Sequence, residues 1–115
     1  MAAEKNFENR LKKFLESESC WFVKFFANAY TKSGIPDLLV CCNGYFLGVE
    51  VKAPNGKPSE LQKRNIQKIN DSNGFGIVLF PDQFEQFKKL IWFVKNNEWY
   101  KARQIMKEIN ERWDK

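Results

Sequence analysis

The strongest folding signal in the chain is a predicted β-hairpin within residues 34–52, centred on Asn43-Gly44. An Asn-Gly pair between two apolar runs is typical of a two-residue type I′ turn, which fixes the residues of the two strands that face each other. With this turn, Asp37 lies directly across from Glu50. Opposite side chains of an antiparallel pair lie roughly 4.5–5.5 Å apart at Cβ. The turn therefore predicts two neighbouring carboxylates at the open end of the hairpin.

The two faces of this hairpin differ in chemistry, because side chains alternate between faces along a strand. One face is apolar throughout: Leu38, Val40, Cys42, Tyr45, Leu47, Val49 and Val51. The other is apolar near the turn and charged at the open end: Asp37, Leu39, Cys41, Phe46, Gly48, Glu50 and Lys52. The glycine beside Glu50 leaves room for another part of the molecule to approach. Two facing carboxylates repel each other and favour a cation between them.

Two interpretations of these charges are open. Oxygen ligands without histidine suit a hard ion such as Mg²⁺, which makes the acids a candidate metal site. Alternatively, Lys52 neutralises the acids on a solvated face, as is ordinary in antiparallel sheets. The flanking sequence favours a functional site, because Gly34 and Pro36 mark a rigid loop before the aspartate and Pro54-Asn55-Gly56 ends the second strand.

Composition narrows the chemistry further. The chain of 115 residues has no histidine, which excludes Cys/His zinc sites and histidine-based hydrolysis, so any catalysis depends on carboxylates, lysine and a metal. Three cysteines imply no disulfide framework and a reducing, cytoplasmic location. No apolar run approaches the roughly 20 residues of a membrane helix, and we expect a single domain with no membrane partner.

Periodicity predicts one small mixed sheet with helices on its faces, an α/β fold. Helices are expected at about 6–18, 59–71 and 98–112. A further helix is expected to begin with Asp82 as its N-cap and to end at the break at Asn96-Asn97. Strands are expected at 21–30, on both sides of the hairpin turn, and at 76–80. The last strand is short and continuously apolar, as in a buried parallel strand. Helix 59–71 should turn Leu61, Asn65, Ile66 and Ile69 inward. Two tryptophans of the final helix, Trp99 and Trp113, fit either the core or a subunit interface.

Several polar residues have an ordinary structural explanation beside any functional one. Glu8 lies in the first turn of a helix, where an acid interacts favourably with the helix dipole. Gln62 forms a capping box with Ser59. Lys32 and Ser33 could contact a phosphate or simply be solvated in a loop. Residues 21–80 nevertheless hold seven basic and four acidic side chains, within a net charge of +5, and such a surface attracts phosphates.

The arrangement Pro36-Asp37 followed by Glu50-Val51-Lys52 resembles the PD-(D/E)xK nuclease motif. Residues 32–39, 50–52 and 56–62 together are similar to the VRR-NUC branch of that superfamily, whose members occur as stand-alone viral or phage proteins and as domains of repair nucleases. The resemblance covers about residues 4–95 and implies a restriction-endonuclease-like αβββαβ core. We therefore expect residues 1–115 to form a single domain of this type. The final helix, at about 98–112, lies outside the resemblance and is an addition to the domain.

The resemblance also implies roles for individual residues. Asp37 and Glu50 would hold Mg²⁺ or Mn²⁺ together with the backbone carbonyl of Val51. Lys52 would orient the attacking water or stabilise charge on the phosphate. Glu8 would reach the metal directly or through water. A further glutamine, Gln62, would support the lysine or the substrate. The candidate DNA contacts are Lys32, Ser33, Lys57, Lys63 and Arg64.

The implied function is a metal-dependent endodeoxyribonuclease of DNA repair or recombination. Stand-alone members similar in size act as homodimers on branched DNA such as Holliday junctions. Two alternatives come from other classes of protein. The first is a non-catalytic DNA-binding or interaction module that kept the fold. The second is a nuclease subunit that is active only with a helicase partner.

Overall fold

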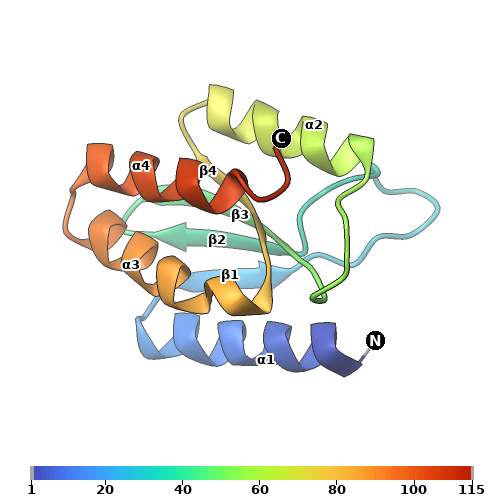
Figure 1. Ribbon diagram of the computed structural model, residues 1–115, viewed down its shortest axis with the longest axis horizontal. Helices are drawn as coiled ribbons and strands as arrows, with labels where there is room; N and C mark the ends of the chain where they lie inside the picture. Colours follow the sequence, from blue (N-terminus) through green and yellow to red (C-terminus); the bar gives the residue numbers. More distant parts are fainter. Residues whose placement is uncertain (1, 115) are drawn as a thin grey trace.

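The computed structural model describes residues 2–114 and shows a four-stranded mixed sheet with helices packed around it (Figure 1). The strands are β1 (Trp21–Lys24), β2 (Leu38–Cys42), β3 (Tyr45–Val51) and β4 (Phe75–Leu79). The helices are α1 (Ala2–Ser17), α2 (Glu60–Asp71), α3 (Phe84–Lys95) and α4 (Trp99–Asn110), and a 3₁₀ turn, η1 (Pro81–Gln83), precedes α3. The sheet order is β1-β2-β3-β4, with the last pair parallel and the others antiparallel. The expected α/β fold and its αβββαβ order are confirmed.

The predicted hairpin register is also confirmed. Cys42 pairs with Tyr45 at the turn, and Leu38 pairs with Val49 at the other end of the ladder. Asn43 and Gly44 both have positive φ, 52° and 82°, as a type I′ turn requires. The Asn43 side chain donates to the carbonyl of Val94 at 3.1 Å, so the turn is fastened to the end of α3. The predicted apolar face is buried, apart from the half-buried Tyr45 beside the turn.

The first strand is shorter than predicted, because β1 ends at Lys24 rather than continuing to residue 30. The backbone of Asn28 accepts from and donates to the Thr31 side chain, and the Asn28 side chain accepts from the N–H of Tyr30 at 2.7 Å. Such side-chain bonds offer the backbone a turn in place of a sheet ladder. Residues 25–37 therefore form a loop between β1 and β2, despite their aromatic content.

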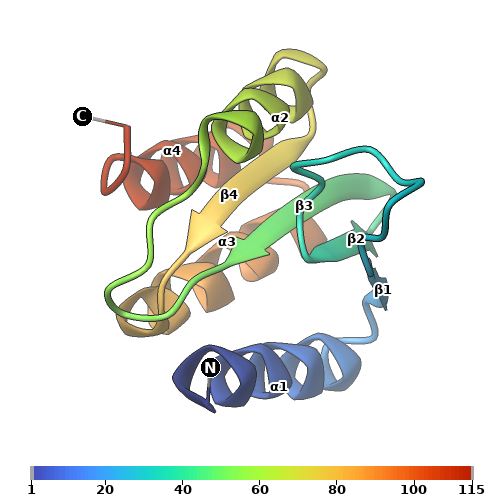
Figure 2. The ribbon, with the colours of Figure 1, turned by 90° about the vertical axis from the view of Figure 1, so that its right-hand side faces the viewer.

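The helices cover the two faces of the sheet differently. Figures 1 and 2 show α2 on one face, α1 and α3 on the other, and α4 alongside β4. The buried side of α3 consists of apolar residues: Phe84, Phe87, Leu90, Ile91 and Val94. The prediction that Asp82 is the N-cap of this helix is wrong, because Asp82 lies in η1 and Gln83 is the N-cap residue. The side chain of Gln83 instead accepts from the N–H of Phe80 at 3.1 Å.

Helix α2 packs closely on the hairpin at Gly48. A Cβ at this position would lie 2.7 Å from Cδ1 of Ile69 and 3.1 Å from Cγ of Pro36. The room left by the glycine is therefore filled by α2 and by the loop before β2, which sets the distance between α2 and the hairpin. Ile66 is buried as predicted, whereas Leu61 is exposed and not inward. The first turn of α2 instead directs Gln62 toward Glu50 of β3.

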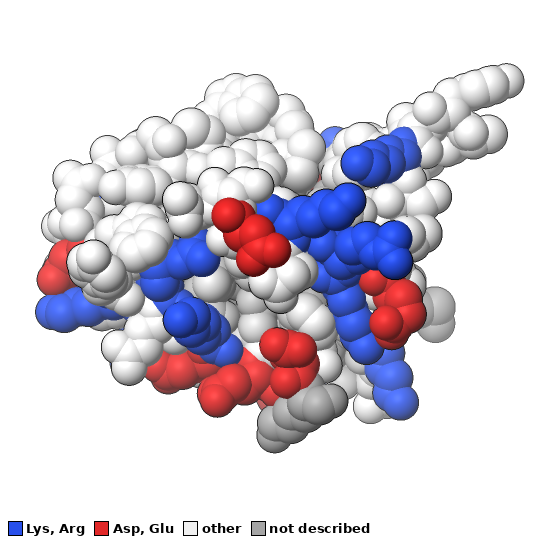
Figure 3. Space-filling model, turned by 90° about the horizontal axis from the view of Figure 1, so that it is seen from above, with Lys and Arg blue, Asp and Glu red and all other residues white. Residues whose placement is uncertain are grey.

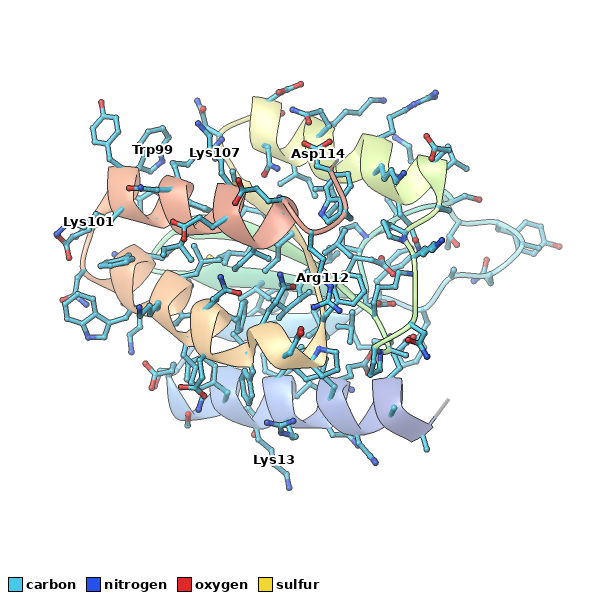
Figure 4. All side chains as sticks on the ribbon, viewed as in Figure 1. Lys13, Trp99, Lys101, Lys107, Arg112 and Asp114 are labelled. Atoms are coloured by element: carbon cyan, nitrogen blue, oxygen red, sulfur yellow. The ribbon has the colours of Figure 1, made fainter. Side chains whose placement is uncertain are left out.

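The C-terminal helix closes one edge of the sheet. Asn110 at the end of α4 accepts from the N–H of Val78 at 3.2 Å and donates to the carbonyl of Gly76 at 2.9 Å, so its amide pairs with the open side of β4. Figure 4 shows Arg112 just beyond α4, where it bonds to Asp82. Trp99 and Trp113 pack against the core. No helix within residues 2–114 has the length and apolar character needed to cross a membrane.

Candidate active site

The candidate site lies at the open end of the β2–β3 hairpin. The ladder ends at the pair Leu38–Val49, and one further residue along each strand places Asp37 opposite Glu50. The carbonyl of Asp37 accepts from the N–H of Phe25 at 2.8 Å, and its Oδ2 accepts from the N–H of Val51 at 2.8 Å. Backbone bonds from two neighbouring strand ends thus fix both the main chain and the side chain of Asp37.

Glu50 is a buried acid, only 3% exposed, and two side chains contact its Oε2 atom. Gln62 donates from Nε2 at 3.0 Å, and the Nζ of Lys52 lies 3.4 Å away. The Lys52 side chain is itself only 13% exposed. The solvated salt-bridge interpretation of these charges fits poorly, because neither partner projects into bulk solvent.

Burial, followed by repulsion from the Asp37 carboxylate, raises the pKa of Glu50 to about 8. Attraction to Lys52 acts in the opposite direction but is the smaller effect. Two acids are therefore held side by side although one of them is difficult to ionise there. Strongly raised carboxyl pKa values of this kind are concentrated at functional sites.

A second group of charges adjoins this pair from the α1 side of the sheet. Lys24, the last residue of β1, places its Nζ 2.7 Å from Oε1 of Glu8 and 3.3 Å from Oδ1 of Asp37. The other oxygen of Glu8 lies 3.2 Å from the Nζ of Lys12, one helical turn along α1. Glu8 is 5% exposed, so it interacts with more than the helix dipole. Burial alone would raise the pKa of Glu8, but the bonds from the two lysines outweigh it and lower the pKa.

The donor set at the hairpin end fits a hard divalent cation. Mg²⁺ is commonly held by one or two carboxylates while it keeps several waters for the substrate phosphate to replace. Asp37 and Glu50 supply the two carboxylates. The carbonyl of Val51 is directed toward the same edge as its N–H, because both groups of a strand residue face one side, and that N–H contacts Asp37. Within residues 2–114, no larger cluster of acids or cysteines is arranged to bind a metal.

The structure brings together most of the residues singled out from sequence, with two differences. Gln62 lies in the site, but it contacts Glu50 rather than Lys52. Glu8 is connected to Asp37 through Lys24. From the sequence alone, Lys24 is only one of the seven basic residues within 21–80. A lysine closing an apolar strand is a weak signal, and the register of β1 on β2 is needed to place it beside Asp37.

Gln62 performs both roles that the sequence left open. Its Oε1 accepts from the N–H of Ser59 at 2.8 Å in a complete capping box, while its Nε2 donates to Glu50. We expect Gln62→Ala to lower the free energy of unfolding by about 1 kcal/mol through loss of the cap and to reduce any metal-dependent activity. Ser59→Ala is the matched control, since it removes the cap bond but leaves the Glu50 contact. Equal activity losses in the two variants, measured beside urea unfolding, would show that Gln62 is only a cap residue.

The candidate DNA contacts lie beside this site on the α2 side. Lys57 precedes α2, Lys63 and Arg64 lie in its first turns, and Lys32 and Ser33 lie in the loop before β2. The carbonyl of Ser33 accepts from Asn65 of α2 at 3.1 Å, so the loop and the helix form one surface. Figure 3 shows basic side chains gathered over this side, next to a broad surface without charges. Lys63 also bonds to Glu60 at 3.1 Å.

A cavity of about 500 Å³ lies on the same sheet face as the two acids. Apolar side chains of the hairpin and α2, including Leu39, Phe46 and Ile69, form most of its wall. Its charged lining residues are both basic, Lys32 and Lys68. The surface next to the candidate site is therefore partly apolar and carries positive charge at its rim.

Comparison with known proteins gave one match. The sequence model of the VRR-NUC domain matches residues 6–80, which run from within α1 to just beyond β4 and include every candidate site residue. Helices α3 and α4 lie beyond the matched region. Searches of curated proteins and of solved structures found no significant match.

Proposed function

The chain belongs to the VRR-NUC family of nuclease-type domains, and from this premise we propose that it is a Mg²⁺- or Mn²⁺-dependent endodeoxyribonuclease. The observation that carries the proposal is the buried Glu50 beside Asp37, with Lys52 in contact. A fold that buries one acid against another loses stability, unless a cation joins them. A non-catalytic module of the same fold would have no need of that arrangement.

Each residue of the site has a distinct task under this proposal. Asp37, Glu50 and the carbonyl of Val51 would hold the divalent ion, which supplies charge neutralisation at the phosphate and activation of water. The Val51 N–H and Gln62 orient the two carboxylates through the bonds described above. Lys52 offers an ammonium group that orients the attacking water or stabilises charge on the phosphate.

The proposed substrate is branched DNA, including four-way junctions. The α2 surface, with Lys57, Lys63 and Arg64 next to the Lys32–Ser33 loop, would contact phosphates, and such contacts position DNA without reading its sequence. Lys63 remains available because its pair with Glu60 is exposed and contributes little.

The test compares a labelled four-way junction with linear duplex of the same sequence, in Mg²⁺, in Mn²⁺ and in EDTA. We expect the junction to be cut faster than the duplex and EDTA to abolish both reactions. Binding without cleavage in any metal would favour the DNA-binding module. Cleavage that appears only after a helicase is added would favour the subunit alternative.

We also propose that the active form is a homodimer, supported by an exposed apolar surface on the outer face of β1–β3. Trp21 is 65% exposed, Phe46 45% and Val23 40%, and an exposed apolar patch of this kind marks an interaction site. We expect the wild-type chain to elute as a dimer in size exclusion with light scattering and Trp21→Glu to elute as a monomer. Trp92→Glu, at an exposed tryptophan of α3, is the matched control and should remain dimeric. A monomeric wild-type chain contradicts the proposal.

A further inference from the structure

Lys24 joins two acids that come from different parts of the chain. Its Nζ lies between Oε1 of Glu8 in α1, at 2.7 Å, and Oδ1 of Asp37 before β2, at 3.3 Å. The second oxygen of Asp37 is occupied by the N–H of Val51. The Asp37 carboxylate is therefore held from two sides, by a cation on one and by the β3 backbone on the other.

Glu8 is fully engaged by lysines. Its Oε1 bonds to Lys24 and its Oε2 pairs with Lys12 at 3.2 Å. Because the Glu8 side chain is buried, losing the nearer ammonium would leave a poorly compensated charge, which costs more than the loss of an exposed ion pair. The geometry therefore favours an indirect role in which Glu8 orients Lys24 against Asp37.

The two acids of the hairpin end already have one lysine each. Asp37 forms a salt bridge with Lys24, and Glu50 forms one with Lys52. A divalent ion between the two acids offsets the repulsion between their facing carboxylates. An ion between Glu8 and Asp37 would instead have to displace the ammonium of Lys24 or lie against it, and like charges at contact repel strongly in a partly buried site.

We propose that Lys24 is a cation built into the site: it takes the position between Glu8 and Asp37, so that the chain binds one divalent ion rather than two. The inference rests on the proposed nuclease function and specifies its metal requirement. Lys24 is then a positioning residue. It fixes the Asp37 carboxylate and supplies positive charge where a second metal ion would otherwise be needed.

The test counts metal ions by titrating Mn²⁺ into metal-stripped protein in a calorimeter. We expect one Mn²⁺ per chain for the wild type and for Lys24→Arg. In Lys24→Gln the amide can still donate to Glu8 but carries no charge, so we expect two Mn²⁺ per chain. Junction cleavage by this variant should fall about 100-fold at low Mn²⁺, as on loss of one preorganised donor, and should recover partly at high Mn²⁺.

Lys12→Gln is the matched control, because Lys12 pairs with the same Glu8 but has no bond to Asp37. It should bind one Mn²⁺ and cut at the wild-type rate. Two ions per wild-type chain, or one in Lys24→Gln, would overturn the inference and leave the nuclease proposal standing. A wild-type chain that neither binds Mn²⁺ nor cuts any DNA contradicts both.

A measurement on the unmodified protein covers the case in which Lys24→Gln does not fold. The ammonium resonance of Lys24, held by two acids, should exchange slowly with water and be visible by lysine-selective NMR. We expect it to persist when Mg²⁺ saturates the site. Loss of this resonance on adding Mg²⁺ would mean that the ion displaces Lys24, and the inference would be wrong.

Discussion

Lys52→Ala is expected to lower metal-dependent cleavage by about 100- to 1,000-fold while Mn²⁺ binding is retained. Lys52 is not a ligand in the proposed site, because its ammonium is itself cationic. Its Nζ lies 3.4 Å from Glu50, and its side chain is largely buried. The reacting phosphate would therefore lose a fixed positive charge that solvent cannot replace. Asp37→Asn should differ by losing Mn²⁺ binding as well as cleavage, since it removes a ligand.

The measurement is single-turnover cleavage of the four-way junction beside calorimetric Mn²⁺ titration of each variant. Lys13→Ala is the control, because Lys13 lies on the outer side of α1 and points away from the protein (Figure 4). It should leave both cleavage and metal binding unchanged. Cleavage by Lys52→Ala within about threefold of the wild type would show that the lysine serves only to pair with Glu50.

The parts of the site that sequence could predict are those set by local chemistry. The Asn43-Gly44 turn determined the register, and the register placed Asp37 beside Glu50. Gln62 could be placed because the capping box fixes where α2 begins. In each case a few neighbouring residues contain the whole signal, so a single sequence is sufficient.

The parts that sequence missed depend on contacts between distant segments. β1 ends early, at Lys24, and the loop that follows is turned by bonds to the side chains of Asn28 and Thr31, which β propensity does not represent. The position of Lys24 follows from that early end and from the packing of α1 beneath the sheet. Likewise, Asn110 pairs with β4 from 32 residues away, and no local pattern marks it as the group that closes a sheet edge.

Glu50→Gln is expected to stabilise the metal-free protein, even though it should abolish metal binding. The pKa of Glu50 is raised from 4.5 to about 8, so between these values the folded state binds a proton that the unfolded state has released. Wild-type stability is therefore fully retained below about pH 4.5 and falls as the pH rises through 8. At about 1.4 kcal/mol per pKa unit, the whole loss is about 5 kcal/mol at most.

Glutamine removes this dependence because it is neutral at every pH and can still accept the bond from Gln62. We therefore expect urea unfolding at pH 9 to show Glu50→Gln more stable than wild type by about 2–4 kcal/mol, with almost no difference near pH 4.5. Glu60→Gln, at an exposed acid of α2, is the control and should follow the wild-type profile. Parallel pH profiles for Glu50→Gln and wild type would mean that Glu50 is ionised at little cost.

Adding Mn²⁺ should stabilise the wild type but not Glu50→Gln. An ion that binds only the folded state stabilises it by about 2.7 kcal/mol at 100 times its Kd, and only the wild type retains both carboxylates to bind it. At pH 8 the wild-type chain should therefore gain stability with Mn²⁺ while Glu50→Gln does not respond. A chain whose unfolding is insensitive to Mn²⁺ would have a buried acid pair with no cation to join it. Burying Glu50 would then destabilise the protein without creating a metal site, and the metal-dependent mechanism would lose its physical basis.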